Sequence, residues 1–294
     1  MTTIGFIGLG VMGAPMAANL VAAGFDVAGY NRSPQKTERL VAAGGRRADS
    51  VADACAAADV VITMLPDSPD VESVVLGEDG VLAHVRPGTV LVDMSTIRPD
   101  VARALAEAGT TRGVGVLDAP VSGGEQGAID ATLSIMVGGD ADTFTSVRPV
   151  LDAMGSTVVH VGSAGSGQTV KAANQLMVAG IIGLVSEALV FLDAHGVDRD
   201  RAVDVLSGGL AGSAVLERKA PAMLRREFSP GFRVDLHHKD LGIVAAAARE
   251  AGVATPLGSL AGTLMAATRA QGHGSMDHSA LLLLVEQLSG KTGD

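Results

Sequence analysis

A glycine-rich turn near the N-terminus constrains the fold more than any other feature of the chain. An apolar run, 4–7, leads directly into GLGVMG at 8–13, and a small-residue helical segment, 14–23, follows. In such a strand–turn–helix unit the first glycine permits the tight turn, the second lets a pyrophosphate approach the backbone, and the third lets the helix pack close to the strand. The pattern predicts a dinucleotide-binding unit, with a plain glycine turn as the alternative. The residues expected to contact the cofactor are Gly8, Gly10, Val11, Met12 and Gly13.

The next predicted strand, 26–30, ends at the position that chooses between the two nicotinamide dinucleotides. In NAD sites an Asp or Glu at this strand end accepts hydrogen bonds from the ribose 2′-hydroxyl and repels a 2′-phosphate. This chain has the neutral Asn31 there, then Arg32, whose planar and permanently charged guanidinium suits phosphate, and Ser33, which adds a hydroxyl donor. We therefore expect NADP(H) to be preferred, with NAD(H) possible. The alternative is that Arg32 is a solvated loop charge.

Composition limits the class of protein and its partners. The 294 residues suffice for two domains, and 47% hydrophobic against 18% charged residues is typical of a globular protein. The formal net charge of −10 argues against nucleic acid or an anionic membrane as a partner, since both attract basic surfaces. Cys55 is the only cysteine and the N-terminus lacks a basic leader segment. We therefore expect a cytoplasmic protein in which Cys55 is a small buried residue.

One stretch, 172–192, is long and apolar enough to suggest a membrane span. It contains Asn174, Gln175, Ser186 and Glu187, which hydrocarbon would penalise, so a long helix buried between protein surfaces is the preferred interpretation. The seven histidines do not have the spacing of metal ligands, and His237 and His238 would point apart on a helix. We therefore expect no metal site.

The sequence pattern divides the chain into a first part with alternating strand and helix signals and a second part with helix signals alone. To about residue 162, short β-rich runs alternate with helical or loop segments, as in a parallel, doubly wound α/β sheet. After the flexible segment 163–167, apolar residues recur three and four positions apart, which is typical of helices. We predict a Rossmann domain, 1–162, and an all-α domain, 163–294, entered through a long helix. The other expected strands are 60–65, 90–94, 115–119, 133–138 and 157–161, and the expected helices are 168–194, 199–208, 212–226, 235–251, 256–271 and 277–289.

Three segments follow predicted strands, where ligands bind in an open parallel sheet. Segments 64–66 and 95–96 should line the nicotinamide side of the cofactor groove. In segment 120–124, adjacent glycines after a serine can present a row of backbone N–H groups suited to a carboxylate or phosphate, although the same residues suit an ordinary turn. The residues singled out in these segments are Met64, Leu65, Pro66, Thr96, Ser122, Gly123 and Gly124.

The start of the long predicted helix carries the candidate catalytic residues. Lys171, Asn174 and Gln175 share one helix face, because residues three and four apart are neighbours. A lysine that loses solvation there would favour its neutral form, and it could give a proton to a carbonyl oxygen as hydride arrives. Asn174 or Gln175 could orient the same oxygen or a neighbouring hydroxyl. The alternative is that Lys171 is a surface charge.

Six blocks of the chain resemble the β-hydroxyacid dehydrogenase family, and they run essentially from end to end. They are GLGVMG at 8–13, MLPDSPDV at 64–71, DAPVSGGEQGAIDATLSIMVGGD at 118–140, GQTVKAANQ at 167–175, GGLAGSAVLERKAP at 208–221 and PGFRVDLHHKDL at 230–241. Within the family, DAPVSGGEQGAID, GGLAGS and DHSA at 277–280 are most similar to the branch that reduces tartronate semialdehyde.

The resemblance implies a Rossmann domain followed by a helical domain, with the active site in the cleft between them. By this resemblance, Lys171 would be the general acid/base, and Ser122, Gly123 and Gly124 would bind the substrate carboxylate. Lys239 of the helical domain would reach toward the cofactor, with Phe232 and Asp240 nearby.

The implied activity is the reversible reduction of tartronate semialdehyde to glycerate, with Lys171 as proton donor, and Arg32 makes NADP(H) the expected cofactor. The same groups would serve 3-hydroxyisobutyrate oxidation or the reduction of glyoxylate or succinic semialdehyde. Imine reduction and a dinucleotide-binding module without catalysis are remoter alternatives. Many relatives carry Asn four residues after the lysine, whereas this chain has Gln175 there and Asn174 one place earlier, so which amide orients the substrate stays open. We expect a homodimer or homotetramer in which the helical domains pack together.

Overall fold

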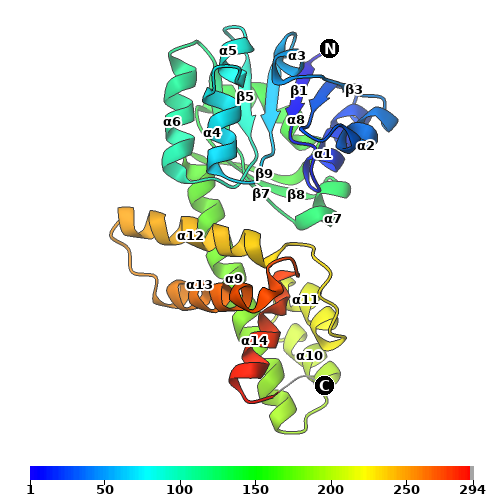
Figure 1. Cartoon of the computed structure of the whole chain (residues 1–294), viewed down its shortest axis with the longest axis vertical. Helices are drawn as coiled ribbons and strands as arrows, with labels where there is room; N and C mark the ends of the chain where they lie inside the picture. The colour runs from blue at the N-terminus through cyan, green and yellow to red at the C-terminus, as the bar shows by residue number, and fades with distance from the viewer. Residues whose placement is uncertain (292–294) are drawn as a thin grey trace. The chain divides into compact units, whose positions relative to one another are not determined.

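The computed structural model describes residues 1–291 and contains two compact units. The first unit is Met1–Lys171, and the second begins at Ala172. Helix α9 (Ser166–Ala194) contains the point of division, so its first turn belongs to the first unit. In Figure 1 the labelled strands lie in the blue-to-green part of the chain, and the yellow-to-red part is helical. Positions 292–294 of the predicted second domain lie outside the described residues.

A nine-stranded sheet forms the framework of the first unit. The strand order is β3-β2-β1-β4-β5-β6-β8-β7, and β9 pairs with β8. The order runs outward in both directions from β1, as in the doubly wound sheets that bind dinucleotides where the order reverses. The strands are β1 (Thr3–Ile7), β2 (Asp26–Tyr30), β3 (Arg46–Arg47), β4 (Val60–Thr63), β5 (Val90–Asp93), β6 (Gly115–Asp118), β7 (Val121–Ser122), β8 (Leu133–Gly138) and β9 (Gly155–Gly162).

The parallel strands end in register. Ile7 pairs with Tyr30 on one side and Thr63 on the other, Thr63 pairs with Asp93, and Asp93 pairs with Asp118. The loops that follow these residues therefore leave the sheet along one edge. This register brings together the loops that the sequence singled out.

The sheet differs from the all-parallel expectation on one side, where β8 runs antiparallel to both β6 and β7. After β6 the chain reverses through β7 and the short helix α7 (Gly124–Ile129), and it makes no long crossover over a face of the sheet. A parallel partner needs such a crossover. Strand β9 is again parallel to β8, because α8 (Ala141–Asp152) supplies the crossover.

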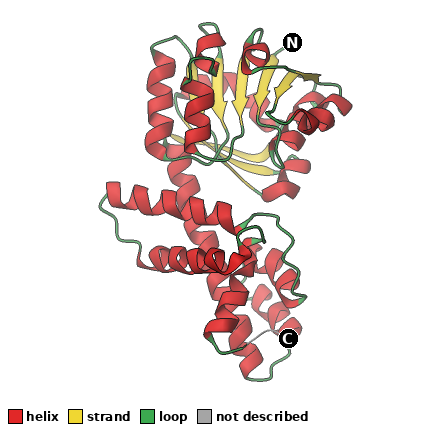
Figure 2. Cartoon of the chain, viewed as in Figure 1, coloured by secondary structure: helices red, strands yellow, loops and turns green. Residues whose placement is uncertain are grey.

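Helices cover both faces of the sheet, as Figure 2 shows. Because successive strand residues point to opposite faces, Phe6 packs with α1, α7 and α8, whereas Ile7 packs with α3, α4, α5 and α6. Cys55 is 2% exposed, which confirms the predicted buried residue, and burial raises the pKa of its thiol to about 12. The remaining helices of this unit are α1 (Gly13–Ala22), the 3₁₀ turn η1 (Pro34–Thr37), α2 (Glu38–Ala42), α3 (Val51–Cys55), α4 (Ser68–Leu76), α5 (Val81–His84) and α6 (Pro99–Thr110).

The described part of the second unit, 172–291, contains helices and no strand. Its buried core consists of Ala, Val, Ile, Leu and Met side chains. The predicted helix 199–208 is confirmed as α10 (Arg199–Gly208). The predicted helix 256–271 is interrupted after Thr268 by a π-helical turn, and 277–289 begins as a 3₁₀ turn. The other elements are α11 (Ala214–Leu224), α12 (Val234–Glu250), α13 (Pro256–Thr268), η2 (Arg269–His273), η3 (His278–Ala280) and α14 (Leu281–Leu288).

Candidate active site

The glycine loop after β1 is tightly packed at two glycines and open at the third. Gly8 has φ +103°, and a Cβ on it would lie 2.3 Å from the Met64 carbonyl oxygen. A Cβ on Gly13 would lie 2.0 Å from the Gly8 carbonyl oxygen, so this glycine lets α1 pack against the loop. A Cβ on Gly10 would meet no described atom within 4 Å. The tight turn, the close helix and the open backbone are the three features that a bound pyrophosphate requires.

The N-terminus of α1 is open to an anion, in contrast to three other helices of this unit. Within the described residues no side chain caps α1, and its first turn contains no acidic residue. Ser50, Asp67 and Asp140 cap α3, α4 and α8 by accepting hydrogen bonds from backbone N–H groups. At the loop before α1, Val11 is exposed and Met12 is half-buried. A pyrophosphate would satisfy the free N–H groups of α1, so the residues present fit a nicotinamide dinucleotide.

Asn31 and Arg32, at the end of β2, have different environments. Asn31 holds the glycine loop, since its Oδ1 accepts from Leu9 N at 3.0 Å and its Nδ2 donates to Ser33 O at 3.2 Å. The Arg32 side chain is 84% exposed, and its Nη2 lies 4.0 Å from Asp70 Oδ1. An exposed ion pair at that distance is weak. The Arg32 guanidinium is therefore available to a phosphate, whereas Asn31 has a positioning role that the sequence did not predict.

Buried hydrogen bonds tie the loops after β4 and β5 together. Asp93 Oδ1 accepts from Thr63 Oγ1 at 2.7 Å and from Ser95 Oγ at 2.6 Å. Ser95 Oγ in turn accepts from Leu65 N at 2.9 Å. Asp93 is 1% exposed, and burial raises the pKa of its carboxyl to about 6. The carboxyl group thus organises two loops without facing solvent.

The predicted nicotinamide-lining residues lie in these two loops. Met64, Leu65 and Thr96 are half-buried, and Pro66 is exposed. Met64 N donates to Ile7 O at 2.9 Å, which keeps its loop beside the glycine turn. The structure therefore brings the glycine loop and both lining segments to one edge of the sheet.

Segment 122–124 has the backbone of an anion-binding turn. Gly123 and Gly124 have φ +142° and +67°, values that other residues rarely adopt. A Cβ on Gly124 would meet no described atom within 4 Å, and Ser122 is half-buried and paired with Ser134 across β7 and β8. Consecutive left-handed glycines can turn their N–H groups toward one ligand. The carboxylate-binding role of this segment stays a prediction that the geometry accommodates.

Helix α9 begins in the first unit, where a buried carboxyl group holds its first turn. Asp118, at the end of β6, accepts from Gly165 N at 2.7 Å and from Gln168 N at 2.9 Å. Burial raises the pKa of the Asp118 carboxyl, and these two N–H groups oppose the shift. Lys171, three residues beyond Gln168, is 6% exposed. That burial does not fit a solvated surface lysine.

In the second unit, four predicted site residues form one polar chain. Asn174 Nδ2 donates to Gln175 Oε1 at 2.9 Å, and Gln175 Nε2 donates to Asp240 Oδ2 at 2.5 Å. Asp240 Oδ1 lies 3.0 Å from Lys239 Nζ. Gln175 and Asp240 are 4% and 2% exposed, whereas Asn174 is half-buried. The buried amide of this chain is therefore Gln175.

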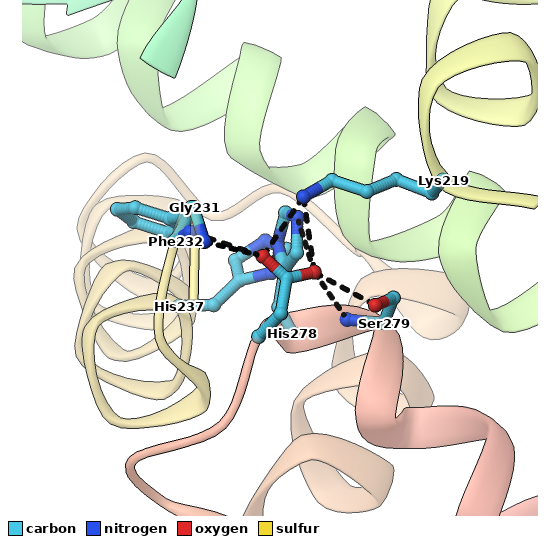
Figure 3. A network of polar contacts seen from close by, with 7 residues as sticks. Lys219, Gly231, Phe232, His237, His278 and Ser279 are labelled. Carbon is cyan, nitrogen blue, oxygen red and sulfur yellow. Dashed lines mark hydrogen bonds and ion pairs between the residues drawn. The ribbon is translucent and has the colours of Figure 1, made fainter. Parts of the chain in front are cut away.

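A second network in this unit is centred on Asp277 and is drawn in Figure 3. Asp277 Oδ2 accepts from Gly231 N at 3.0 Å and Phe232 N at 3.1 Å, and Lys219 Nζ lies 3.0 and 2.9 Å from the two carboxylate oxygens. Burial opposes ionisation, but the positive charges of His278 and Lys219 lower the pKa of Asp277 to about 2. This carboxylate fixes the backbone around Phe232, one of the predicted site residues.

The sequence did not predict the histidine contact beside this network, because its partners lie on separate helices. His278 Nδ1 lies 2.9 Å from His237 Nδ1, and His237 Nε2 lies 3.2 Å from Gln175 O. Since a carbonyl oxygen only accepts, His237 Nε2 carries a proton, and the two Nδ1 atoms share another. The Phe232 ring packs against both imidazoles in an edge-to-face geometry, at centroid distances of 5.7 and 5.5 Å. The blocks at 230–241 and 277–280 contain the members of this cluster, but neither block indicates that they meet.

Two further expectations concern metal and membrane. Residues 1–291 include no group of His, Cys, Asp and Glu side chains that could hold a metal ion. Helix α9 is long and apolar enough to cross a membrane by length and composition, and 44% of its most apolar 18-residue window is buried within the protein. Mostly buried core helices pass the same test of length and composition.

Two family profiles match consecutive parts of the chain. Residues 3–162 match the NAD binding domain of 6-phosphogluconate dehydrogenase. Residues 165–285 match the NAD-binding domain of NADP-dependent 3-hydroxyisobutyrate dehydrogenase. The fold and these matches define a nicotinamide-dependent oxidoreductase.

Comparison with individual relatives indicates which family of oxidoreductases the chain belongs to. The chain is 40% identical to an NAD-dependent L-serine dehydrogenase of Pseudomonas aeruginosa, over 99% of this chain and 100% of the relative. It is 40% identical to 2-hydroxy-3-oxopropionate reductase of Escherichia coli, over 97% and 98%. A structure of Mycobacterium tuberculosis 3-hydroxyisobutyrate dehydrogenase with L-serine superposes with a TM-score of 0.88 at 39% identity, covering 97% of this chain and 99% of that one. The chain belongs to the β-hydroxyacid dehydrogenase family and is an NAD(P)-dependent oxidoreductase of hydroxyacids.

Proposed function

We propose that the protein reduces tartronate semialdehyde reversibly to glycerate, with NADPH as the preferred hydride donor. The observation that carries this proposal is Lys171, which is 6% exposed on the first turns of α9. That helix begins against the edge of the sheet that also bears the glycine loop, because Asp118 holds its backbone. A buried amine beside a nicotinamide site suits proton transfer coupled to hydride transfer.

Three of the candidate substrates differ in a single substituent. Glycerate, 3-hydroxyisobutyrate and L-serine share a hydroxymethyl group and a carboxylate, and the carbon between them bears a hydroxyl, a methyl or an ammonium group. A hydroxyl or ammonium group needs a polar partner, whereas a methyl group does not. The chain from Asn174 through Gln175 to Asp240 could supply one. We favour the hydroxyl because the blocks at 118–130 and 208–213 resemble the tartronate semialdehyde branch.

Oxidation of L-serine is the second candidate. It is supported by the L-serine dehydrogenase that is 40% identical over 99% of this chain. Because the two substrates differ only at the central carbon, the same lysine and carboxylate site would serve both. The distinction rests on which substituent the pocket stabilises.

The chain's own residues divide the work as follows. The nicotinamide, when bound, supplies or accepts the hydride. Lys171 Nζ gives a proton to the aldehyde oxygen during reduction and takes it back during oxidation. Ser122, Gly123 and Gly124 hold the carboxylate and so fix the position of the reacting carbon. From the second unit, we keep Lys239 as a cofactor-side residue, on the strength of the resemblance alone.

A substrate panel tests the proposal. Oxidation of NADPH is followed with tartronate semialdehyde, methylmalonate semialdehyde and glyoxylate, and reduction of NADP⁺ with glycerate, 3-hydroxyisobutyrate and L-serine at matched concentrations. We expect kcat/KM to be highest for the tartronate semialdehyde–glycerate pair. A higher value for L-serine or 3-hydroxyisobutyrate would reassign the substrate and keep the mechanism, and no turnover of any compound would overturn the enzyme assignment at this site.

The preference for NADPH rests on Arg32. Its guanidinium is 84% exposed beside the neutral Asn31, and Asp70 holds it only weakly. We expect Arg32→Ala to weaken NADPH binding about tenfold or more and NADH binding by less than about twofold, since only NADPH carries the 2′-phosphate. Lys36→Ala, which removes a nearby exposed cation, is the matched control. Equal losses for the two cofactors would contradict this role of Arg32.

We also propose self-association through α9. Val170, Met177, Leu184 and Phe191 recur every seven residues on this helix and are 38%, 66%, 67% and 64% exposed. A stripe with this spacing can pack against its copy on a second chain. A cytoplasmic location stays a prediction from the single cysteine.

A further inference from the structure

The loop that contains Thr96 is held by one side chain of α9. Gln168 is 1% exposed. Its Oε1 accepts from Ile97 N at 3.1 Å, and its Nε2 donates to Ser95 O at 2.8 Å. The two hydrogen bonds therefore fix the backbone immediately before and after Thr96. A neutral planar amide supplies one donor and one acceptor, which a carbonyl and an N–H group require.

Both ends of this link are fixed independently. On the helix side, Asp118 accepts from Gln168 N at 2.9 Å, and a Cβ on Gly167 would lie 2.3 Å from Met136 O, so the first turn is seated closely on the sheet. On the loop side, Ser95 Oγ donates to Asp93 at 2.6 Å. Gln168 thus links two fixed backbone segments, which are the helix turn that leads to Lys171 and the loop that contains Thr96.

We infer that Gln168 is a positioning residue that sets Thr96 relative to Lys171. This inference rests on the proposed function, in which Lys171 transfers the proton and Thr96 lies on the nicotinamide side. Lys171 is three residues from Gln168 and therefore lies on the same helix face, one turn further on. Because the amide bonds the backbone of the Thr96 loop, any change at Gln168 alters the spacing between the proton donor and the nicotinamide side of the groove.

The expected signature is a loss of turnover without a comparable loss of cofactor binding. Within residues 1–291, the Gln168 side chain bonds Ser95 O and Ile97 N, which lie outside the glycine loop and α1 that hold the pyrophosphate in the proposed function. Misplacing reacting groups by about 1 Å can lower the rate of the chemical step about a hundredfold. A slower chemical step also exposes more of the intrinsic isotope effect on hydride transfer.

The test compares Gln168→Met, which keeps the length of the side chain but not its hydrogen bonds, with Ser68→Ala. Ser68 is the matched control because its buried Oγ accepts from Arg98 N at 3.1 Å, one residue beyond Ile97. For Gln168→Met we expect kcat to fall about a hundredfold, the Kd of NADPH to stay within about threefold, and the isotope effect with 4-deuterated NADPH to rise. Ser68→Ala should keep kcat within about threefold.

Four results would overturn the inference. These are a near-normal kcat in folded Gln168→Met, a parallel loss of kcat and NADPH affinity, an equal loss of kcat in Ser68→Ala, and an unchanged isotope effect. Gln168→Glu, which keeps the acceptor for Ile97 N and loses the donor to Ser95 O, is the second variant. If neither variant folds, the amide is needed for the fold itself and the positioning role is wrong.

Lys171→Ala is measured in parallel to separate this inference from the proposed function. Loss of turnover in Lys171→Ala with normal turnover in Gln168→Met would overturn the positioning role alone. Normal turnover in Lys171→Ala would overturn the proposed function whatever Gln168→Met does.

Discussion

Two buried aspartates show how differently the two units are built. Asp93 and Asp277 are 1% and 3% exposed, but burial raises the pKa of Asp93 to about 6, whereas His278 and Lys219 lower the pKa of Asp277 to about 2 despite its burial. Asp93 receives hydrogen bonds from neutral hydroxyls, and Asp277 faces a lysine ammonium at 2.9 Å. The first unit thus buries a carboxyl group whose ionisation is penalised, and the second buries an ion pair.

The difference follows from the architecture. At the sheet edge, the register fixes Thr63 beside Asp93, so the strand ends already stand close together and neutral hydrogen bonds suffice to join their loops. In the helical unit, an isolated β-bridge between Arg233 and Asp277 links two of the segments that Asp277 joins, and Lys219 comes from the separate helix α11. A charged pair with several donors is a stronger link between such segments.

The largest effect is expected when the ion pair is broken. Asp277→Ala leaves Lys219 without its carboxylate and three backbone N–H groups without an acceptor. We therefore expect the free energy of unfolding, measured by denaturant titration, to fall by about 4 kcal/mol. Asp235→Ala, which removes an exposed partner of Arg269, should cost less than about 1 kcal/mol. Because the folded pKa of Asp277 is lowered, its stabilisation is present above the unfolded value of 3.8 and is lost as the pH falls toward about 2. Equal costs for the two variants would contradict the comparison.

Asp93 should show the opposite pH dependence. Its folded pKa lies above the unfolded value of 3.8, so its neutral form stabilises the fold at low pH and that contribution is lost as the pH rises through about 6. The stability of Asp93→Asn relative to the original chain should therefore rise by about 2 kcal/mol from about pH 4 to about pH 8. Chemical denaturation at the two pH values measures this change. A relative stability that did not change with pH would show that Asp93 is not penalised when it ionises.

The smallest effect on folding is expected on the exposed face of α9. Leu184 is 67% exposed, so Leu184→Glu should change the unfolding free energy of the monomer by no more than about 0.5 kcal/mol. The same change places charges inside the proposed interface between copies, and light scattering should show dissociation. Leu76→Glu, at a 41% exposed position on α4, is the matched control. An unchanged mass for Leu184→Glu would place the interface elsewhere.

The sequence predicts most of the first unit because its signals are local. The strands at 26–30 and 133–138 have the predicted bounds, since an apolar run ended by glycine or a turn is visible in a few residues. Strands β3 and β7 have two residues each and exist only by pairing with neighbours, so no pattern reveals them. The antiparallel direction of β8 depends in the same way on tertiary pairing.

In the candidate site, too, the sequence predicts local motifs but not contacts between distant segments. Contiguous motifs reveal the glycine loop and Lys171, and both stand in the predicted local structure. The bond from Gln168 to Ile97 joins residues 71 positions apart, and the ion pair of Lys219 with Asp277 joins residues 58 apart. Such contacts follow from the packing of separate elements, and a single sequence carries no local sign of them.

The most direct test of the central claim is turnover of Lys171→Ala with tartronate semialdehyde and NADPH, measured beside NADPH binding. Removal of the proton donor should lower kcat about a thousandfold while the Kd of NADPH stays within about threefold. Lys291→Ala, which removes a lysine paired with Asp193, should behave like the original protein. Turnover of Lys171→Ala within about threefold of the original chain would contradict the claim that this buried lysine carries the proton.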